Sequence, residues 1–224
     1  PRPFELDPAV MARIRPMLFH DAPRIAELHH AAMGNSLWAR LGTNFLSVLY
    51  KQLVNDERFL GYVYLEDSKI RGFIAGSLNP DQMMQEVFRK SWFLLGPAAF
   101  PRALKPDILR KLLETSRYAE ASSSVALPQA VPAESLFCSF ESDLRGKRIS
   151  GHINKVLFDD LLARGHRFVK VTTEIDNDGA NRQLMSWGFE SCGEFEFYGK
   201  QMRTYVLDLV SSERVDPVSR HPSV

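Results

Sequence analysis

A basic stretch in the second half of the chain has residue types that bind anions. Arg145, Lys147 and Arg148 place three cationic side chains within four residues, with Gly146 among them. The stretch leads into residues 153–163, whose amphipathic pattern predicts a helix. A glycine-containing turn before a helix gathers backbone N–H donors and the positive end of the helix dipole around an anion. A solvated basic turn that binds nothing accounts for these residues equally well.

A second pattern follows the next predicted strand. Asn177 can cap a helix over residues 179–187, and Gly188 can end it. Ala180 and Phe189 complete the pattern. A short capped helix with a glycine stop explains Asn177 and Gly188 by itself. It does not explain why the pattern occurs downstream of an Arg-Gly-Lys loop.

The two patterns together resemble the motifs of the GNAT acyltransferase superfamily. That family's phosphate loop reads roughly Gln/Arg-x-x-Gly-x-Gly/Ala, and residues 145–151 here read RGKRISG. Its closing motif reads Asn-x-x-Ala-x-x-x-Tyr-x-x-x-Gly-Phe, and residues 177–189 here read NDGANRQLMSWGF. The resemblance covers residues 136–209 more strongly than residues 14–76. It implies an α/β (α+β) domain with a mostly antiparallel mixed sheet, one splayed parallel strand pair and flanking helices.

The resemblance also implies a reaction. The chain would bind acetyl-CoA or another acyl-CoA and transfer the acyl group to a primary amine by direct attack in a ternary complex. Backbone N–H groups of the basic loop would hold the pyrophosphate, and no metal is expected. The residues that it places against the donor are Phe140, Arg145, Gly146, Lys147, Arg148, Ser150 and Gly151, with Asn177 and Asn181 beside the pantetheine.

Two residues depart from the family pattern. Arg148 stands at the usual glycine of the loop and adds bulk there, although its charge can contact phosphate directly. Leu184 stands where the family commonly has a tyrosine that protonates the departing thiolate, and leucine has no proton to give. Either another group supplies the proton, or the thiolate leaves with solvent help, or the protein binds acyl-CoA without turnover. Tyr198 and Tyr205 are candidate substitutes, with core packing as the alternative for each.

Transfer to an amine also needs a group that removes a proton from the ammonium. Glu141 and Glu174 each follow a predicted strand, and the carboxyl ends of parallel strands are a general ligand location. We predict Glu141 as the base and Tyr198 as the acid; a solvated loop carboxylate is the alternative reading of both glutamates. His152 falls on the first helical turn, where capping or phosphate contact is expected.

Two other functions fit the same residues. Leu184 and Arg148 favour a catalytically silent domain that senses acyl-CoA or binds a partner. The basic loop also suits an acyltransferase whose donor is an acyl-carrier protein, because such carriers present an acidic surface. A carrier-dependent rate would fall steeply with salt.

The elements that must position these residues are predicted from periodicity. Alternating or continuous apolar runs predict strands, and apolar residues at helical spacing predict helices. In the first half these are a strand over 14–18, a helix over 22–33 capped by Asp21, a helix over 45–53 and a hairpin over 60–65 and 70–76. In the second half they are strands over 135–140 and 168–173, helices over 153–163 and 179–187, and a hairpin over 194–197 and 202–209.

Residues 79–131 interrupt this regularity. They contain helical patterns over 81–95 and 106–118, separated by a Gly/Pro-rich stretch over 96–101, and then a Ser/Ala/Pro-rich linker. We predict one domain over residues 12–210 with this helical insert, and flexible termini over 1–11 and 211–224. Apolar residues of the insert form core contacts or roof a pocket for the acceptor or a long acyl chain. Together with residues 37–45, the insert should set specificity.

Composition excludes several classes of protein. The 224 residues carry 28 Lys+Arg and 27 Asp+Glu, and a net charge of +1 argues against a nucleic-acid surface. Cys138 and Cys192 form no CxxC pair, and no run approaches the roughly 20 apolar residues of a membrane helix. We therefore expect a soluble cytoplasmic protein. The family resemblance implies a small-molecule or peptide amine as acceptor. We expect no nucleic acid and no membrane span, and a homodimer is left open.

Overall fold

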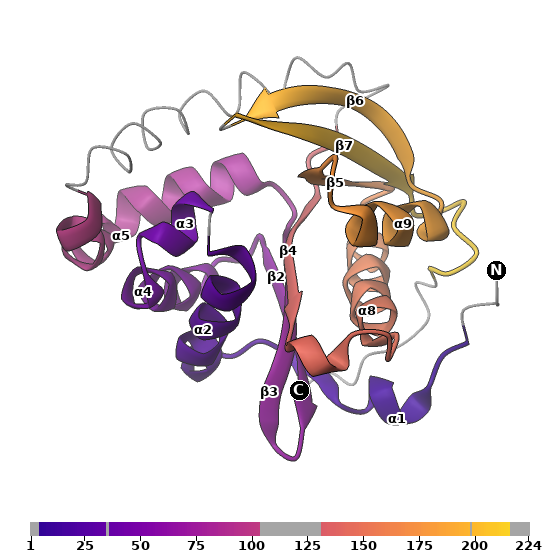
Figure 1. The fold of residues 1–224 in the computed structure, drawn as a ribbon, viewed down its shortest axis with the longest axis horizontal. Coiled ribbons are helices and arrows are strands. Elements are labelled where there is room, and N and C mark those ends of the chain that lie inside the picture. Colours follow the sequence, from indigo (N-terminus) through magenta and orange to yellow (C-terminus); the bar gives the residue numbers. More distant parts are fainter. Residues whose placement is uncertain (1–4, 35, 104–130, 198, 216–224) are drawn as a thin grey trace.

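The computed structural model describes residues 5–34, 36–103, 131–197 and 199–215. They contain one seven-stranded sheet with the order β1-β2-β3-β4-β5-β7-β6 (Figure 1). Its strands are β1 (Ile14–Pro16), β2 (Phe59–Glu66), β3 (Lys69–Ser77), β4 (Glu134–Phe140), β5 (Phe168–Glu174), β6 (Glu190–Phe197) and β7 (Lys200–Asp208). Neighbours pair antiparallel throughout, except for β4 and β5, which are parallel. The predicted mixed sheet with one parallel pair is confirmed.

Helices cover both faces of the sheet (Figure 1). One face carries α2 (Ala22–Met33), α3 (Leu37–Arg40), α4 (Thr43–Leu53) and α5 (Pro80–Ala103). The other carries α8 (Ile149–Ala163) and α9 (Asp178–Trp187). The short helices are α1 (Pro8–Met11), η1 (Phe19–Asp21) and η2 (Ser142–Leu144). None of the described helices is both long and apolar enough to cross a membrane.

Each helical layer buries its own apolar cluster against the sheet. The first cluster joins α2, α4 and α5 through residues such as Ile25, Leu46 and Met83. The second joins α8 and α9 through residues such as Leu157 and Trp187. Because β4 lies between the two clusters, both layers fix the position of this strand.

Helix α5 differs from the sequence prediction. Gly96 and Pro97 predict a break after residue 95, but α5 continues through them to Ala103. Leu95 is buried, and Ala98 and Ala99 pack against the first cluster, so tertiary contacts keep this segment helical despite the proline. The second predicted helix, over 106–118, lies outside the described residues.

Two further local predictions need correction. Asp21 was predicted to cap α2, but its side chain makes no capping bond; it accepts from Arg15 at 2.6 and 2.9 Å and from the Leu18 N–H at 2.8 Å. Helix α8 begins at Ile149, four residues before the predicted start. The last residues of the basic stretch over 145–151 therefore belong to the helix, and the loop itself ends at Arg148.

Parts of both termini contact α8. The Asp7 N–H donates to His152 Nε2 at 2.9 Å, and α1 follows directly. At the other end, Lys155 Nζ donates to the Arg214 carbonyl at 2.9 Å. The predicted flexibility of residues 1–11 and 211–224 stays a prediction.

Candidate functional site

The parallel strands β4 and β5 separate soon after they meet. Glu134 and Lys170 form their register pair, and the Lys170 N–H donates to the Ala133 carbonyl at 3.0 Å. On its other side β4 has a bulge, because Ala75 of β3 faces Phe137 while Gly76 faces Ser135. Leu136 is thus left without a partner residue on β3. Bulges are enriched beside active sites, and this one lies just past the point of the fork.

Glu134 is a buried carboxylate at the point of this fork. Only 6% of the residue is exposed, and Lys170 Nζ lies 3.3 Å from its Oε2 atom. Burial raises the pKa of Glu134, Lys170 opposes that shift, and Asp81 on α5 adds to it. A carboxylate so placed can exchange a proton with a molecule that enters the fork. Sequence reasoning missed Glu134 because it searched the carboxyl ends of the strands; the available signal was a charged residue at the head of a β-prone run.

The basic loop lies at the opposite end of β4. The Glu141 N–H donates to the Arg71 carbonyl at 2.9 Å, and Leu144 is buried in the second cluster. The next four residues, Arg145 to Arg148, are all exposed. Among the described residues, none of the three cations of this stretch forms an ion pair. They are therefore available to an anion.

Arg148 adopts a backbone conformation that favours glycine. Its φ is 57° and its ψ is 13°, in the left-handed region, directly before Ile149 begins α8. This conformation costs a side-chain-bearing residue roughly 1–2 kcal/mol. The loop thus keeps the shape of a glycine turn although an arginine occupies it. No side chain caps the N-terminus of α8, which leaves its first N–H groups for another partner.

Ser150 and Gly151 lie in the first turn of α8 rather than in a loop. The Ser150 carbonyl accepts from Asn154 Nδ2 at 2.7 Å, and the Gly151 N–H donates to the Arg148 carbonyl at 3.1 Å. His152 is buried, with Nε2 accepting from Asp7 and Nδ1 donating to the Arg148 carbonyl at 3.0 Å. His152 therefore holds the loop and the N-terminal segment together, and the expected phosphate contact by its ring is wrong for this arrangement.

Phe140 ends β4 with its ring against the backbone of β3. A Cβ atom placed on Gly72 would come within 2.0 Å of that ring. Glycine at position 72 is therefore required for Phe140 to lie flat on the strand. The contact fixes the aromatic side chain at the start of the loop.

The closing motif forms the capped helix that the sequence predicts. Asn177 Oδ1 accepts from the Ala180 N–H at 3.2 Å, and Gly188 ends α9 with a φ of 88°. Asn181 is buried and ties α9 to β5, because its Nδ2 donates to the carbonyls of Glu174 at 3.2 Å and Ile175 at 2.9 Å. Its predicted contact with a donor stays a prediction.

The position of the usual tyrosine is apolar and packed. Leu184 is 8% exposed and belongs to the second cluster. Nearby, the Tyr205 hydroxyl donates to Asn181 Oδ1 at 2.9 Å and accepts from Arg203 Nη1 at 3.3 Å. Tyr205 is thus a buried hydroxyl next to the turn of α9 that carries Leu184. Tyr198, the predicted acid, lies outside the described residues.

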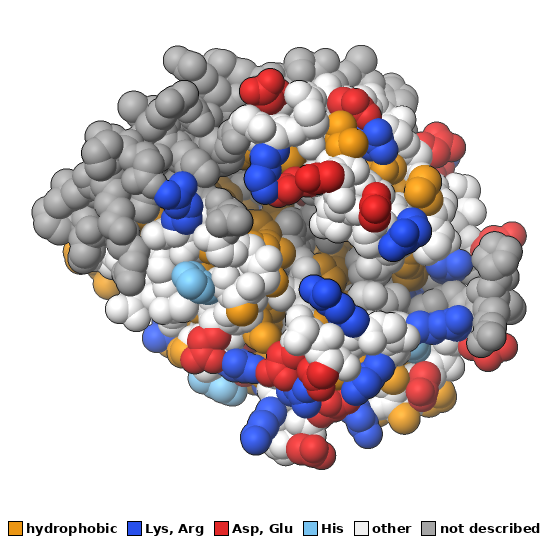
Figure 2. All heavy atoms as spheres, in the orientation of Figure 1, with side chains coloured by type: hydrophobic (Ala, Val, Ile, Leu, Met, Phe, Trp, Pro, Cys, Tyr) orange, Lys and Arg blue, Asp and Glu red, His pale blue; other side chains and the backbone are white. Residues whose placement is uncertain are grey.

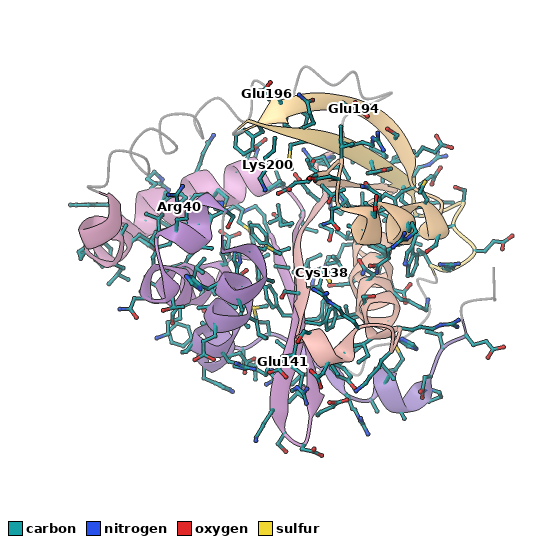
Figure 3. All side chains as sticks on the ribbon, viewed as in Figure 1. Arg40, Cys138, Glu141, Glu194, Glu196 and Lys200 are labelled. Carbon is teal, nitrogen blue, oxygen red and sulfur yellow. The ribbon has the colours of Figure 1, made fainter. Side chains whose placement is uncertain are left out.

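The two carboxylates predicted near the strand ends lie apart. Glu141, after β4, is paired with Arg24 and Arg71. Glu174, at the end of β5, is paired with Lys200. Figure 3 shows Glu141 well separated from Lys200, the partner of Glu174, with Cys138 of β4 between them. In the space-filling view, apolar side chains lie at the bottom of a hollow between the two helical layers (Figure 2).

The described residues form no metal centre, and two of their pockets are lined by residues outside the predicted site. No group of three or more His, Cys, Asp and Glu side chains there is arranged to hold a metal ion. A pocket of about 340 Å³ beside Arg58 and Glu86, and one of about 670 Å³ beside Trp187 and Cys192, contain none of the predicted site residues.

Comparison with solved structures identifies the fold. An N-acetyltransferase from Staphylococcus aureus Mu50 is 18% identical, with a TM-score of 0.56 over 87% of this chain and 99% of that one. The polyamine N-acetyltransferase of Drosophila melanogaster, which forms N-acetylagmatine, is 14% identical, with a TM-score of 0.58 over 87% and 98%. The ribosomal-protein-alanine N-acetyltransferase of Brucella melitensis is 15% identical, with a TM-score of 0.55 over 87% and 98%. No family model and no curated protein matches the chain. The structure thus confirms the fold that the two sequence motifs predict, and the chain has the fold of the GNAT N-acetyltransferases.

Proposed function

We propose that the chain is an acyl-CoA-dependent N-acyltransferase that acts on a primary amine by direct transfer, with acetyl-CoA as the first donor to test. One arrangement carries the proposal: a forked pair of parallel strands with an unpaired basic loop at one end and a buried carboxylate at the other. An extended anionic thioester would lie between these ends, and the shared fold with solved N-acetyltransferases supports this placement.

The nucleotide end of the donor would bind at the loop. Arg145, Lys147 and Arg148 would supply charge, while Gly146 before α8 and Ser150 in its first turn would supply backbone N–H groups. The Gly151 N–H could join them only by releasing the Arg148 carbonyl. Phe140, Asn177 and Asn181 would border the pantetheine. Leu136, at the bulge of β4 and without a partner residue on β3, would lie near the thioester, where a free backbone N–H can bind the carbonyl oxygen.

Transfer requires a neutral amine at the fork. The amine nitrogen attacks the thioester carbon, the C–N bond forms, the C–S bond breaks, and the thiolate takes up a proton. Glu134 is the proton acceptor that the geometry favours, because it is buried at the fork and its pKa is raised. Glu141, the base predicted from sequence, can act only by releasing one of its two arginines. The thiolate would be protonated by Tyr205, by Tyr198 or by solvent.

A silent acyl-CoA-binding domain is the second candidate. The observation in its favour is Leu184, whose packed side chain removes the usual proton donor from α9. The third candidate is an acyltransferase whose donor is an acyl-carrier protein. The exposed cations of the loop favour it, because they could bind the acidic surface of such a carrier.

Calorimetry and a thiol-release assay together distinguish the three candidate functions. Acetyl-CoA should bind, and a panel of primary amines, including a polyamine and a peptide with an N-terminal alanine, should contain one that stimulates thiol release. Binding without amine-dependent release supports the silent domain. Absence of binding for acetyl-CoA and longer acyl-CoAs overturns the proposal. A rate that appears only with acyl-carrier protein, and falls with salt, supports the third form.

A further inference from the structure

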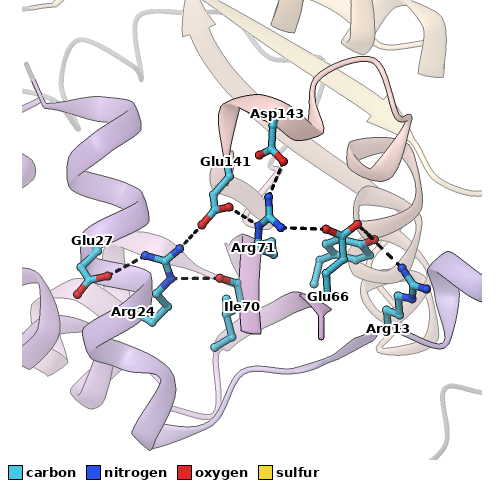
Figure 4. A network of polar contacts seen from close by, with 9 residues as sticks. Arg13, Arg24, Glu27, Glu66, Ile70, Arg71, Glu141 and Asp143 are labelled. Carbon is cyan, nitrogen blue, oxygen red and sulfur yellow. Dashed lines mark hydrogen bonds and ion pairs between the residues drawn. The ribbon is translucent and has the colours of Figure 1, made fainter. Parts of the chain in front are cut away.

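Arg71 on β3 contacts three carboxylates (Figure 4). Its Nη1 lies 3.1 Å from Glu66 Oε2, its Nη2 donates to Asp143 Oδ2 at 2.6 Å, and its Nε donates to Glu141. The guanidinium is 22% exposed, so it is only partly screened by solvent. Arg71 therefore joins its own hairpin to the segment that leaves β4.

Glu141 receives a second arginine from the opposite side. Arg24 on α2 donates through Nη2 to Glu141 and through Nε to the Ile70 carbonyl at 3.1 Å. The two arginines thus occupy both carboxylate oxygens of Glu141 and link α2, β3 and the end of β4. Figure 4 shows this chain of contacts running from Glu27 to Arg13.

The anchored segment is directly continuous with the basic loop. Glu141 and Asp143 are held by Arg71, and Leu144 is buried. Arg145 to Arg148 follow at once and are exposed. The network therefore fixes where the loop leaves the sheet, although none of its members belongs to the exposed stretch.

We propose that Arg71 is a positioning residue for the donor: through Glu141 and Asp143 it holds the basic loop in the geometry that binds the phosphates of the acyl-CoA. This role rests on the proposed function and deepens it. It also assigns Glu141 a structural part in donor recognition rather than proton transfer. A planar guanidinium meets three carboxylates at once, and a lysine ammonium is a compact point charge without that fork geometry.

The test compares two donors that differ in the phosphates. Acetyl-CoA carries them, whereas S-acetyl-N-acetylcysteamine keeps the thioester and the end of the pantetheine without them. Arg71→Ala should raise KM for acetyl-CoA about tenfold or more, because a displaced loop loses its oriented contacts. KM for the truncated thioester and kcat should change little. Arg71→Lys should recover only part of the loss.

Two further variants distinguish donor positioning from proton transfer. Glu141→Gln should reproduce the KM effect with acetyl-CoA alone; a fall in kcat with both donors would show instead that Glu141 is the base. In a Lys147→Ala background, Arg71→Ala should add less to KM than it does in the wild type, because both act on the same contact.

Arg167→Ala is the matched control, because Arg167 makes a comparable pair with Asp208 at 2.8 Å without touching the loop. Both KM values should stay at the wild-type level in this variant. If wild-type protein fails to bind acetyl-CoA in calorimetry, the proposed function fails. If wild-type protein binds it and Arg71→Ala binds equally well, or loses both donors alike, the positioning role is overturned.

Discussion

Lys170 on β5 places its ammonium nitrogen 3.3 Å from a carboxylate oxygen of Glu134 on β4, at the register pair where the two parallel strands meet. The side chains are 19% and 7% exposed, so their attraction is only weakly screened. Burial raises the pKa of Glu134 and the lysine limits that rise. The pair thus places a buried carboxylate with a raised pKa at the point of the fork.

Glu134→Gln should remove the proposed proton acceptor and leave a side chain of similar shape. We expect kcat to fall by about 10²–10⁴-fold, with little change in acetyl-CoA binding. A protonated carboxyl group cannot take a proton from the amine, so the wild-type rate should decline on the acid side. Because the pKa of Glu134 is raised, that decline should begin above the usual pH range of a glutamate. A profile of kcat against pH measures both effects.

Glu86→Gln is the control for this substitution. Glu86 lies on α5 and pairs with Arg58 and Lys90, and none of these three residues belongs to the proposed site. Its replacement should leave kcat and the acid limb unchanged. If the Glu134→Gln enzyme keeps the wild-type kcat and the same decline of kcat at acid pH, Glu134 is not the proton acceptor.

Arg148→Gly separates the backbone role of this position from its charge. Glycine adopts a φ near 57° without steric cost, so the free energy of unfolding should rise by up to about 1 kcal/mol. The lost cation should at the same time weaken acetyl-CoA binding, by roughly tenfold. Chemical denaturation and calorimetry report the two effects independently. Tighter binding of the glycine variant would show that Arg148 obstructs the donor.

His29 predicts a pH dependence of stability. Burial lowers its pKa to about 4, and nearby His30 adds to the shift. Its Nδ1 atom contacts the Tyr50 hydroxyl at 2.8 Å, and its Nε2 atom is buried without a hydrogen-bond partner. Between pH 6.5 and 4 the unfolded chain takes up a proton that the native state does not. The free energy of unfolding should therefore fall as the pH drops, by about 2 kcal/mol between pH 7 and pH 5.

His29→Gln removes that titration. Urea denaturation at pH 7 and pH 5 should show a smaller loss of stability in this variant than in the wild type. Equal losses in both proteins would mean that other groups account for the pH dependence.

The parts of the site that the sequence predicts depend on near neighbours. Asn177 caps α9 through a contact three residues away, and Gly188 stops the same helix with a left-handed turn. The continuous β-prone run over residues 168–173 likewise predicts a strand, and β5 forms there, although only Val169 of it is fully buried. Such signals need only the local chain, which is why the fold and both motifs could be predicted.

The parts that the sequence does not predict are contacts between distant residues. Arg24 and Glu141 are 117 positions apart, and Arg71 and Asp143 are 72 apart. No spacing rule connects such pairs, so Glu141 reads as a free loop carboxylate until the fold brings two arginines to it. The same holds for Glu134, whose burial depends on α5 and β5 rather than on its neighbours in β4.

The buried pair of Lys155 and Asp159 on α8 predicts an asymmetric loss of stability. Their charged atoms are 3.0 Å apart, and the side chains are 6% and 2% exposed. Lys155→Met would leave Asp159 as a buried charge without this partner, and would free the Arg214 carbonyl that Lys155 also binds. We expect a loss of about 3–5 kcal/mol in the free energy of unfolding.

The double variant Lys155→Met, Asp159→Leu distinguishes pairing from packing. With both charges removed, much of the loss should be recovered, because an apolar pair has no desolvation cost. Arg164→Met is the surface control; its pair with Asp160 is also one helical turn long, but Arg164 is 46% exposed, so the change should stay within about 0.5 kcal/mol. If the double variant is less stable than Lys155→Met alone, the loss in the single variant does not come from separating the Asp159 carboxylate from Lys155.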